Sequence, residues 1–154
     1  MTGDGFEVPI TLLITDGRTV KTNQELRTEL FGPAAIVAGL KDPEDLRSTL
    51  SALDGSLTGT IHGGVDDPWT GVALGMLRRR VGRLIFGGVP TGVAVDRAMM
   101  HGGPYPASTS PRDTSVGASA ISRFLRPVTY QDFPDALLPG PVRGATEPEP
   151  SAAT

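Results

Sequence analysis

The feature that most constrains the fold is a strand-and-helix pattern that occurs twice between residues 34 and 86. Each copy begins with a short apolar run, "AAIVAG" and then "LTGTIH", which is typical of a strand buried on both faces. An aspartate that can cap a helix and a proline that suits its first turn follow each run, as Asp42-Pro43 and Asp67-Pro68. The run "RLIF" then gives a third strand. Because strands joined by helices run parallel with right-handed crossovers, we expect an α/β fold with a parallel βαβαβ sheet.

Both predicted helices are amphipathic and have signals at each end. In the first, Leu46, Leu50 and Leu53 recur at helical spacing, and Gly55 offers a left-handed stop. Gly82 offers the corresponding stop for the second helix. The apolar stripe of the second helix consists of Trp69, Val72, Ala73, Met76 and Leu77.

Ligands of open parallel sheets bind beyond the carboxyl ends of the strands, so the segments that follow the three strands are the candidates for a site. These segments are "GLKDP", "HGGVDDP" and a long stretch over residues 87–115. The last is too long for a simple connection, and loops of this length usually carry function.

His101 lies in the most constrained part of that stretch, "MMHGGPYPAS". Gly102 and Gly103 permit a turn with positive φ, and the two prolines that flank Tyr105 are expected to hold it extended. The simpler interpretation of His101 is a loop histidine hydrogen-bonded to backbone. The competing one is a proton or ligand role near neutral pH, and the residues alone leave both open.

Other candidate sites are weaker. The glycines of residues 87–92 suggest a phosphate loop, but Pro90 removes a donor amide and no capped helix follows. His62 follows a buried strand and is more simply a structural histidine, and Arg112 and Asp113 form at most a solvated pair. We expect no metal site, because the two histidines are far apart in the sequence.

Composition excludes several classes of function. A net charge of −3 gives no basic field for nucleic acid, and the absence of cysteine excludes disulfides, thiolate metal sites and thiol nucleophiles within this chain. The apolar runs "ITLLI" and "AAIVAGL" are too short to span a membrane, and the start has no signal-peptide pattern. We expect a soluble, cytoplasmic protein.

Two stretches resemble a known family. "ELFGPAAIV" (residues 29–37) resembles the E-x-F-G-P motif of aldehyde dehydrogenases. Residues 82–139, "GRLIFGG" to "DALLP", are similar to the end of the branch that comprises 2,5-dioxovalerate (α-ketoglutaric semialdehyde) dehydrogenases and fatty-aldehyde relatives. The resemblance implies that residues 1–138 are the C-terminal half of a catalytic domain. Within it, residues 124–134 would be a strand that pairs with a neighbouring subunit, and residues 139–154 a disordered tail.

The resemblance also implies roles for particular residues. Glu29 matches the glutamate that holds the nicotinamide ribose of NAD or NADP, and Phe31 matches the aromatic residue beside the nicotinamide ring. His101 matches a histidine near the catalytic thiol, where a neutral imidazole assists proton movement. Tyr105 would form a wall of the aldehyde pocket. The shelf beneath that pocket would consist of Gly102 and Gly103.

The family reaction needs groups that this chain does not supply, namely a nucleophilic cysteine, a water-activating glutamate, an oxyanion-binding asparagine and a dinucleotide-binding domain. We therefore expect the C-terminal part of an NAD(P)-dependent enzyme that oxidises a small, 2,5-dioxovalerate-like aldehyde to a carboxylate. Alone it would be inactive. Its partners would be the N-terminal part of the enzyme or further copies of itself. The alternatives are a non-catalytic module that binds a partner subunit with the same fold, and a stand-alone binder of small ligands.

Overall fold

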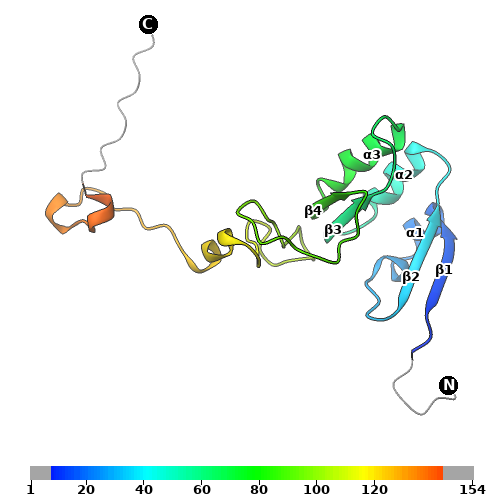
Figure 1. Ribbon diagram of the computed structural model, residues 1–154, viewed down its shortest axis with the longest axis horizontal. Helices are drawn as coiled ribbons and strands as arrows, with labels where there is room; N and C mark the ends of the chain where they lie inside the picture. Colours follow the sequence, from blue (N-terminus) through cyan, green and yellow to red (C-terminus); the bar gives the residue numbers. More distant parts are fainter. Residues whose placement is uncertain (1–7, 144–154) are drawn as a thin grey trace, which may run out of the picture. The chain divides into compact units, whose positions relative to one another are not determined.

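The computed structural model describes residues 8–143, which divide after Arg123 into two units. All strands and α-helices of these residues lie in the first unit (Figure 1). The second unit contains short 3-10 turns. Every residue predicted for the site, from Glu29 to Tyr105, also lies in the first unit.

The first unit opens with a βαβ arrangement that the sequence pattern did not predict. Strand β1 (Thr11–Asp16) runs parallel to β2 (Ala34–Gly39), and helix α1 (Gly17–Thr22) and the 3-10 turn η1 (Glu25–Arg27) connect them. Asp16 caps α1 by accepting a hydrogen bond from the Thr19 N–H at 2.8 Å. The Thr19 hydrogen bonds lower the pKa of Asp16.

The two helices predicted from the Asp-Pro pairs are confirmed. Helix α2 (Pro43–Ser51) and helix α3 (Pro68–Leu77) each begin with the expected proline. The Asp42 carboxylate accepts from the Asp45 N–H at 2.7 Å, and the Asp67 carboxylate accepts from the Trp69 N–H at 2.9 Å.

The predicted glycine stops are wrong. Helix α2 ends at Ser51, before Gly55, and Gly82 lies inside the strand that follows α3. Neither glycine has a positive φ, which among the described glycines is found at Gly87 and Gly117. Gly55 and Gly82 are instead required by the close approach of a distant backbone, described below.

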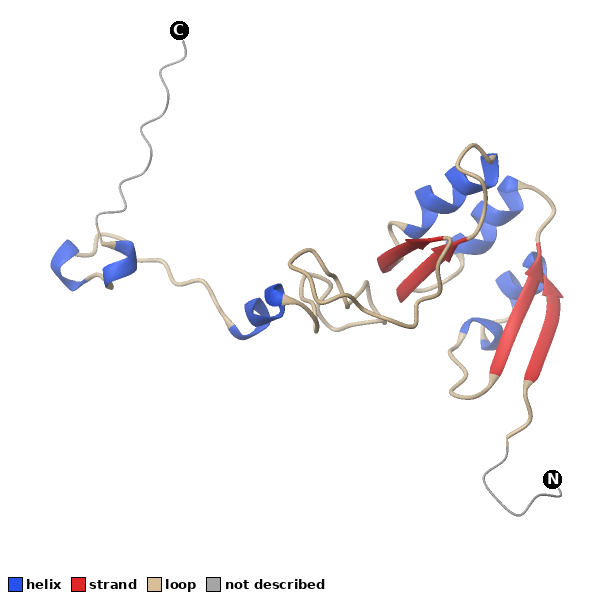
Figure 2. Ribbon diagram, viewed as in Figure 1, coloured by secondary structure: helices blue, strands red, loops and turns tan. Residues whose placement is uncertain are grey.

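The single predicted sheet is also corrected. Strand β3 (Ser56–Ile61) pairs in parallel with β4 (Val81–Phe86), and this pair is separate from the β1–β2 pair (Figure 2). The α/β class and the parallel direction of the strands hold, but β2 does not pair with β3. Local signals determine the elements and their direction, whereas the pairing of edges depends on contacts between distant segments.

The helices pack in one row, because α2 contacts both α1 and α3. The apolar core beneath them is small: within residues 8–143 the buried apolar side chains are Val20 and Ile61, which are 6% and 8% exposed. The outer face of the β1–β2 pair is open, and its exposed apolar residues are Leu12, Ile14 and Val37. This unit therefore leaves apolar surface uncovered that a complete domain would bury.

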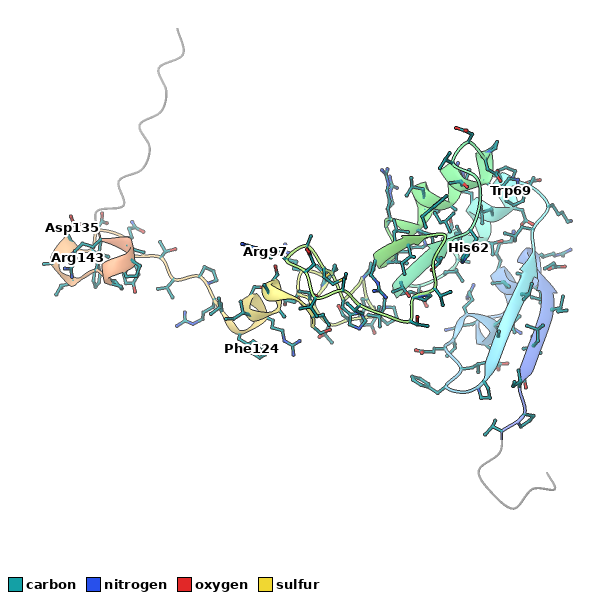
Figure 3. All side chains as sticks on the ribbon, in the orientation of Figure 1. His62, Trp69, Arg97, Phe124, Asp135 and Arg143 are labelled. Atoms are coloured by element: carbon teal, nitrogen blue, oxygen red, sulfur yellow. The ribbon has the colours of Figure 1, made fainter. Side chains whose placement is uncertain are left out.

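The second unit is held by local contacts. The rings of Tyr130 and Phe133 meet edge to face with centroids 5.3 Å apart. The Arg143 guanidinium donates to the Ala136 and Leu138 carbonyls at 3.2 and 3.0 Å, and Figure 3 shows Arg143 in this unit together with Asp135. Its 3-10 turns are η3 (Asp135–Leu137) and η4 (Gly140–Val142), and η2 (Ala118–Phe124) spans the boundary with the first unit.

Two predictions fall on this unit. Residues 125–134 form no strand in the described chain, so a strand formed with a neighbouring subunit stays a prediction about an assembly. Of the predicted tail, residues 140–142 form η4, and residues 144–154 lie outside the described range. No helix within residues 8–143 has the length and hydropathy needed to cross a membrane.

Candidate functional site

The loop around His101 lies at the amino ends of β3 and β4. A Cβ at Gly103 would lie 2.6 Å from the carbonyl oxygen of Ser56, the first residue of β3. A Cβ at Gly82, near the start of β4, would overlap the carbonyl oxygen of Gly102. Gly102 and Gly103 are both buried and neither has a positive φ. The predicted reason for these glycines is therefore wrong, and the close approach of backbones is the actual one.

The predicted edge of the sheet is corrected at the same time. Strand β4 ends at Phe86, so residues 87–101 run back along the strands before the loop reaches their amino ends. His62, which follows β3 directly, lies exposed at the carboxyl ends (Figure 3). His62 and the His101 loop are thus at opposite edges.

Glu29 joins the His101 loop at the amino-end edge, because it precedes β2 in the chain. A cavity of about 720 Å³ opens between the segments there. It is lined by residues 24, 26–29, 53–58 and 106–107. Next to this cavity the backbones approach closely, because a Cβ at Gly55 would clash with the carbonyl oxygens of Pro104 and Tyr105. Glu29 and the end of the His101 loop, which are far apart in the sequence, therefore line one cavity.

The backbone of His101 is firmly held. Its N–H donates to Thr114 Oγ1 at 2.9 Å, and its carbonyl accepts from the Ser115 N–H at 3.1 Å and from Ser115 Oγ at 3.0 Å. Thr114 is 4% exposed, and its hydroxyl donates to the Val116 carbonyl at 2.9 Å. The ring is not held in this way, since Nδ1 is buried and has no hydrogen-bond partner within the described chain. The simpler interpretation, a ring bonded to backbone, does not hold for Nδ1.

A smaller cavity of about 280 Å³ lies beside His101, and its walls are polar. Ser110 Oγ donates to Asp113 Oδ2 at 2.7 Å, and Ser108 Oγ donates to the Gly103 carbonyl at 2.8 Å. The predicted pair of Arg112 with Asp113 is not formed, because Asp113 bonds to Ser110. These hydroxyls stabilise the loop that carries His101.

The aromatic residues predicted for the site are open to solvent. Phe31 is 94% exposed and Tyr105 is 82% exposed. Tyr105 lies in a turn closed by the Ala107 N–H, which donates to the Pro104 carbonyl at 2.9 Å, and its bond to Pro106 is cis. Within the described part of the chain both rings are therefore largely uncovered, so a role beside a nicotinamide or an aldehyde needs further protein.

Arg83 is a structural residue of this region that the sequence did not reveal. From β4 its guanidinium donates to the Gly92 carbonyl at 2.6 Å and to the Pro90 carbonyl at 3.4 Å. It thereby fixes the glycine-rich residues 87–92, which are followed by turns and irregular structure up to residue 117. A lone arginine inside a predicted strand gives no signal of such a role. No cluster of three or more potential metal ligands occurs within residues 8–143.

Comparison with known proteins identifies relatives but no matching family model. The chain is 50% identical over 125 residues to α-ketoglutaric semialdehyde dehydrogenase 2 of Azospirillum brasilense, which covers 80% of this chain and 23% of that protein. It is 48% identical over 118 residues to the α-ketoglutaric semialdehyde dehydrogenase of Acinetobacter baylyi, covering 76% of this chain and 22% of the relative. The chain thus spans less than a quarter of the length of these relatives. Over that span it is a homologue of the α-ketoglutaric semialdehyde dehydrogenases, which are members of the aldehyde dehydrogenase superfamily.

Proposed function

We propose that this chain supplies the C-terminal part of an NAD(P)-dependent aldehyde dehydrogenase that oxidises a 2,5-dioxovalerate-like aldehyde to a carboxylate. The observation that carries the proposal is the identity of 50% over 125 residues to a dehydrogenase of that substrate class. The cavity that Glu29 shares with Pro106 and Ala107 of the His101 loop supports it, while His101 itself lines the separate 280 Å³ cavity. A cytoplasmic location stays a prediction from the sequence.

Glu29 would hold the nicotinamide ribose. Its carboxylate is exposed at the 720 Å³ cavity, and two carboxylate oxygens suit the paired hydroxyl donors of a ribose. The ring of Phe31, two residues further on, is free to cover one face of a nicotinamide. The acceptor oxygens of Glu29 and the ring of Phe31 fit the ribose and nicotinamide end of NAD or NADP, whose nicotinamide would accept the hydride of the reaction. The rest of the cofactor would be held by protein outside this chain.

His101 would move a proton in the aldehyde pocket. Hydrogen bonds to Thr114 and Ser115 fix the backbone of His101, so the attachment point of the ring is defined. The unpartnered Nδ1 leaves the ring without the hydrogen bond that usually orients a histidine acting as an acid or base. The nucleophile would come from elsewhere, since the chain contains no cysteine.

A complementation experiment tests the proposal. The gene for this chain is joined to the upstream part of the Azospirillum brasilense relative, and NAD(P)H formation is followed with 2,5-dioxovalerate and with a medium-chain aldehyde. We expect activity from the joined protein, none from the chain alone, and none after replacement of the relative's catalytic cysteine. An inactive joined protein that is folded and binds NAD(P) would overturn the proposal.

The second candidate is a non-catalytic module that binds a subunit of a related enzyme. The exposed apolar face of β1 and β2 favours it, because such surfaces mark association sites. In the complementation experiment this module would bind the upstream part without any dependence of turnover on His101 or Glu29.

A further inference from the structure

Arg80 lines neither of the two cavities, yet it joins the ends of α3 and α2. It lies in the short turn between α3 and β4, where its N–H donates to the Leu77 carbonyl at 2.8 Å. Its guanidinium reaches the end of the neighbouring helix α2 (Figure 1). There Nη2 donates to the Ser51 carbonyl at 2.9 Å, and Nε donates to the Leu53 carbonyl at 3.2 Å. Arg80 therefore binds carbonyls that the end of a helix otherwise leaves without partners.

The backbone of Arg80 holds the same segment from its other end. Its carbonyl accepts from the N–H of Ser56, the first residue of β3, at 2.7 Å. Arg80 thus holds the connection from α2 to β3, residues 52–55, which we call the α2–β3 turn. A planar guanidinium with several donors at fixed separations suits two carbonyls better than a single ammonium does. A substitution of Arg80 removes these two side-chain bonds and keeps the backbone bond.

The α2–β3 turn is part of the candidate site. Leu53, Asp54 and Gly55 line the 720 Å³ cavity together with Glu29. At Gly55 the turn also meets the end of the His101 loop backbone against backbone, since an added Cβ would clash with the carbonyl oxygens of residues 104 and 105. A contact between two backbones has no rotatable side chain that could absorb a shift. A displacement of the turn is therefore transmitted to the loop.

The contact of Arg80 with the turn does not depend on a carboxylate. Both of its side-chain acceptors are carbonyls, and no ion pair within residues 8–143 involves it. The preceding residue, Arg79, is exposed, and its side chain makes no hydrogen bond in the described part of the chain. The two arginines therefore carry the same charge at adjacent positions, and Arg80 is the one that holds the turn.

We propose that Arg80 is a positioning residue of the dehydrogenase site: through the α2–β3 turn it sets the width of the cavity at Glu29 and the place of the His101 loop. The assignment rests on the proposed function, because it takes this cavity to receive the ribose of NAD(P). Arg80 lies outside the cavity and so acts only through the turn. Without its side-chain bonds the turn moves relative to Glu29, and the cofactor binds more weakly.

Kinetic measurements on the joined protein test this assignment. Arg80→Met keeps an unbranched side chain and removes both donors. We expect the KM for NAD(P) to rise by about fivefold or more, with the shape of the pH profile of kcat unchanged, because cofactor binding weakens and no titrating group is lost. Arg80→Lys keeps the charge and one donor group and should recover part of the affinity. Arg79→Met makes the same change at the exposed neighbour and should leave KM at its native value.

A purely structural role of Arg80 gives a different result. Loss of stability alone would lower the concentration of active protein and hence the apparent kcat, while KM for NAD(P) would stay native. That outcome in Arg80→Met would overturn the assignment, as would an equal rise of KM in Arg79→Met.

Hydrogen exchange on the full chain tests the transmission without any activity. The Ala107 N–H donates to the Pro104 carbonyl at 2.9 Å, in the part of the His101 loop that meets Gly55. In Arg80→Met this amide should exchange at least about tenfold faster than in the native chain. The Gly87 N–H, which donates to the Ile61 carbonyl at 2.9 Å, reports global unfolding and should change less. Equal acceleration at both amides, or none at Ala107, would overturn the assignment.

The two experiments separate this inference from the proposed function. An active joined protein in which Arg80→Met keeps the native KM would support the dehydrogenase and overturn the role of Arg80. An inactive joined protein would count against the dehydrogenase. Faster exchange at Ala107 than at Gly87 in Arg80→Met would support the hold of Arg80 on the His101 loop in either case.

Discussion

The Nζ of Lys21 lies 2.9 Å from Oδ1 of Asp45 and joins α1 to α2, with the two side chains 30% and 18% exposed. The hydrogen bond from Lys21, followed by one from the Lys41 N–H, lowers the pKa of Asp45 below its usual value of 3.8. This contact connects the β1–β2 half of the first unit to the helix that leads into β3. A second hydrogen bond, from Lys21 Nζ to Ser48 Oγ at 2.9 Å, also joins α1 to α2.

The lowered pKa of Asp45 predicts a defined acid sensitivity. A carboxylate whose folded pKa lies below its unfolded one contributes stability that is present above the unfolded value, here 3.8, and is lost as the pH falls through the folded value. We expect the urea midpoint of the chain to fall over that window. Asp45→Asn should lower the midpoint at neutral pH and flatten its decline in acid. Asp66→Asn makes the same change in net charge at an exposed residue and should leave the curve unchanged. A decline that Asp45→Asn leaves intact would assign the acid sensitivity to other groups.

Two glycine substitutions should have opposite effects. In Gly103→Ala the new methyl group would lie 2.6 Å from the Ser56 carbonyl oxygen, and we expect a loss of about 1–3 kcal/mol in the free energy of unfolding, as for other overpacked sites. Gly71 lies in α3 with no atom within 4 Å of an added Cβ, so Gly71→Ala should stabilise by about 0.5–1 kcal/mol. Urea unfolding measures both. Equal effects would show that the His101 loop is not pressed against β3.

The open sheet face should make the isolated chain associate. Leu12 is 57% exposed and Ile14 is 79% exposed on the outer face of β1. We expect size-exclusion chromatography with light scattering to show species larger than a monomer, with binding of the dye ANS. Ile14→Lys should reduce both, because a charge on the face opposes its burial. A clean monomer that does not bind ANS would count heavily against a missing covering part.

The sequence predicted those features that local chemistry determines. The Asp42 and Asp67 caps and the prolines after them place α2 and α3 correctly, because capping involves neighbouring residues alone. The apolar runs likewise place β2, β3 and β4. The pairing of strands and the edge occupied by His101 were predicted incorrectly. Both features depend on contacts between distant segments. Strand pairing depends on which segments lie beside β2 and β3. The position of His101 depends on residues 87–101, which run back along the strands to their amino ends.

Glu29→Gln should separate cofactor positioning from folding. Glu29 is exposed and makes no hydrogen bond within the described residues, so its replacement is expected to leave the urea midpoint within about 0.5 kcal/mol of the native value. In the joined protein the same change should slow turnover, because a misplaced nicotinamide lowers the fraction of reactive geometries. Glu25→Gln, an exposed change of the same kind in η1, is the control for activity. Loss of several kcal/mol of stability in Glu29→Gln would make Glu29 a structural residue.

The last prediction concerns His101 and the activity of the chain by itself. Aldehyde oxidation in the family begins with attack of a thiolate, which a chain without cysteine cannot supply. Proton transfer by a histidine contributes typically about two to four orders of magnitude, far less than an oxidation through a covalent intermediate requires. The isolated chain should therefore form no NAD(P)H from 2,5-dioxovalerate.

In the joined protein, His101→Ala should lower kcat by about 10²–10⁴ and change its pH profile. Thr114→Val removes the acceptor of the His101 N–H, so it should reduce kcat less and mainly lower stability. Steady NAD(P)H formation by the chain alone, proportional to its concentration and abolished by His101→Ala, would overturn this assignment.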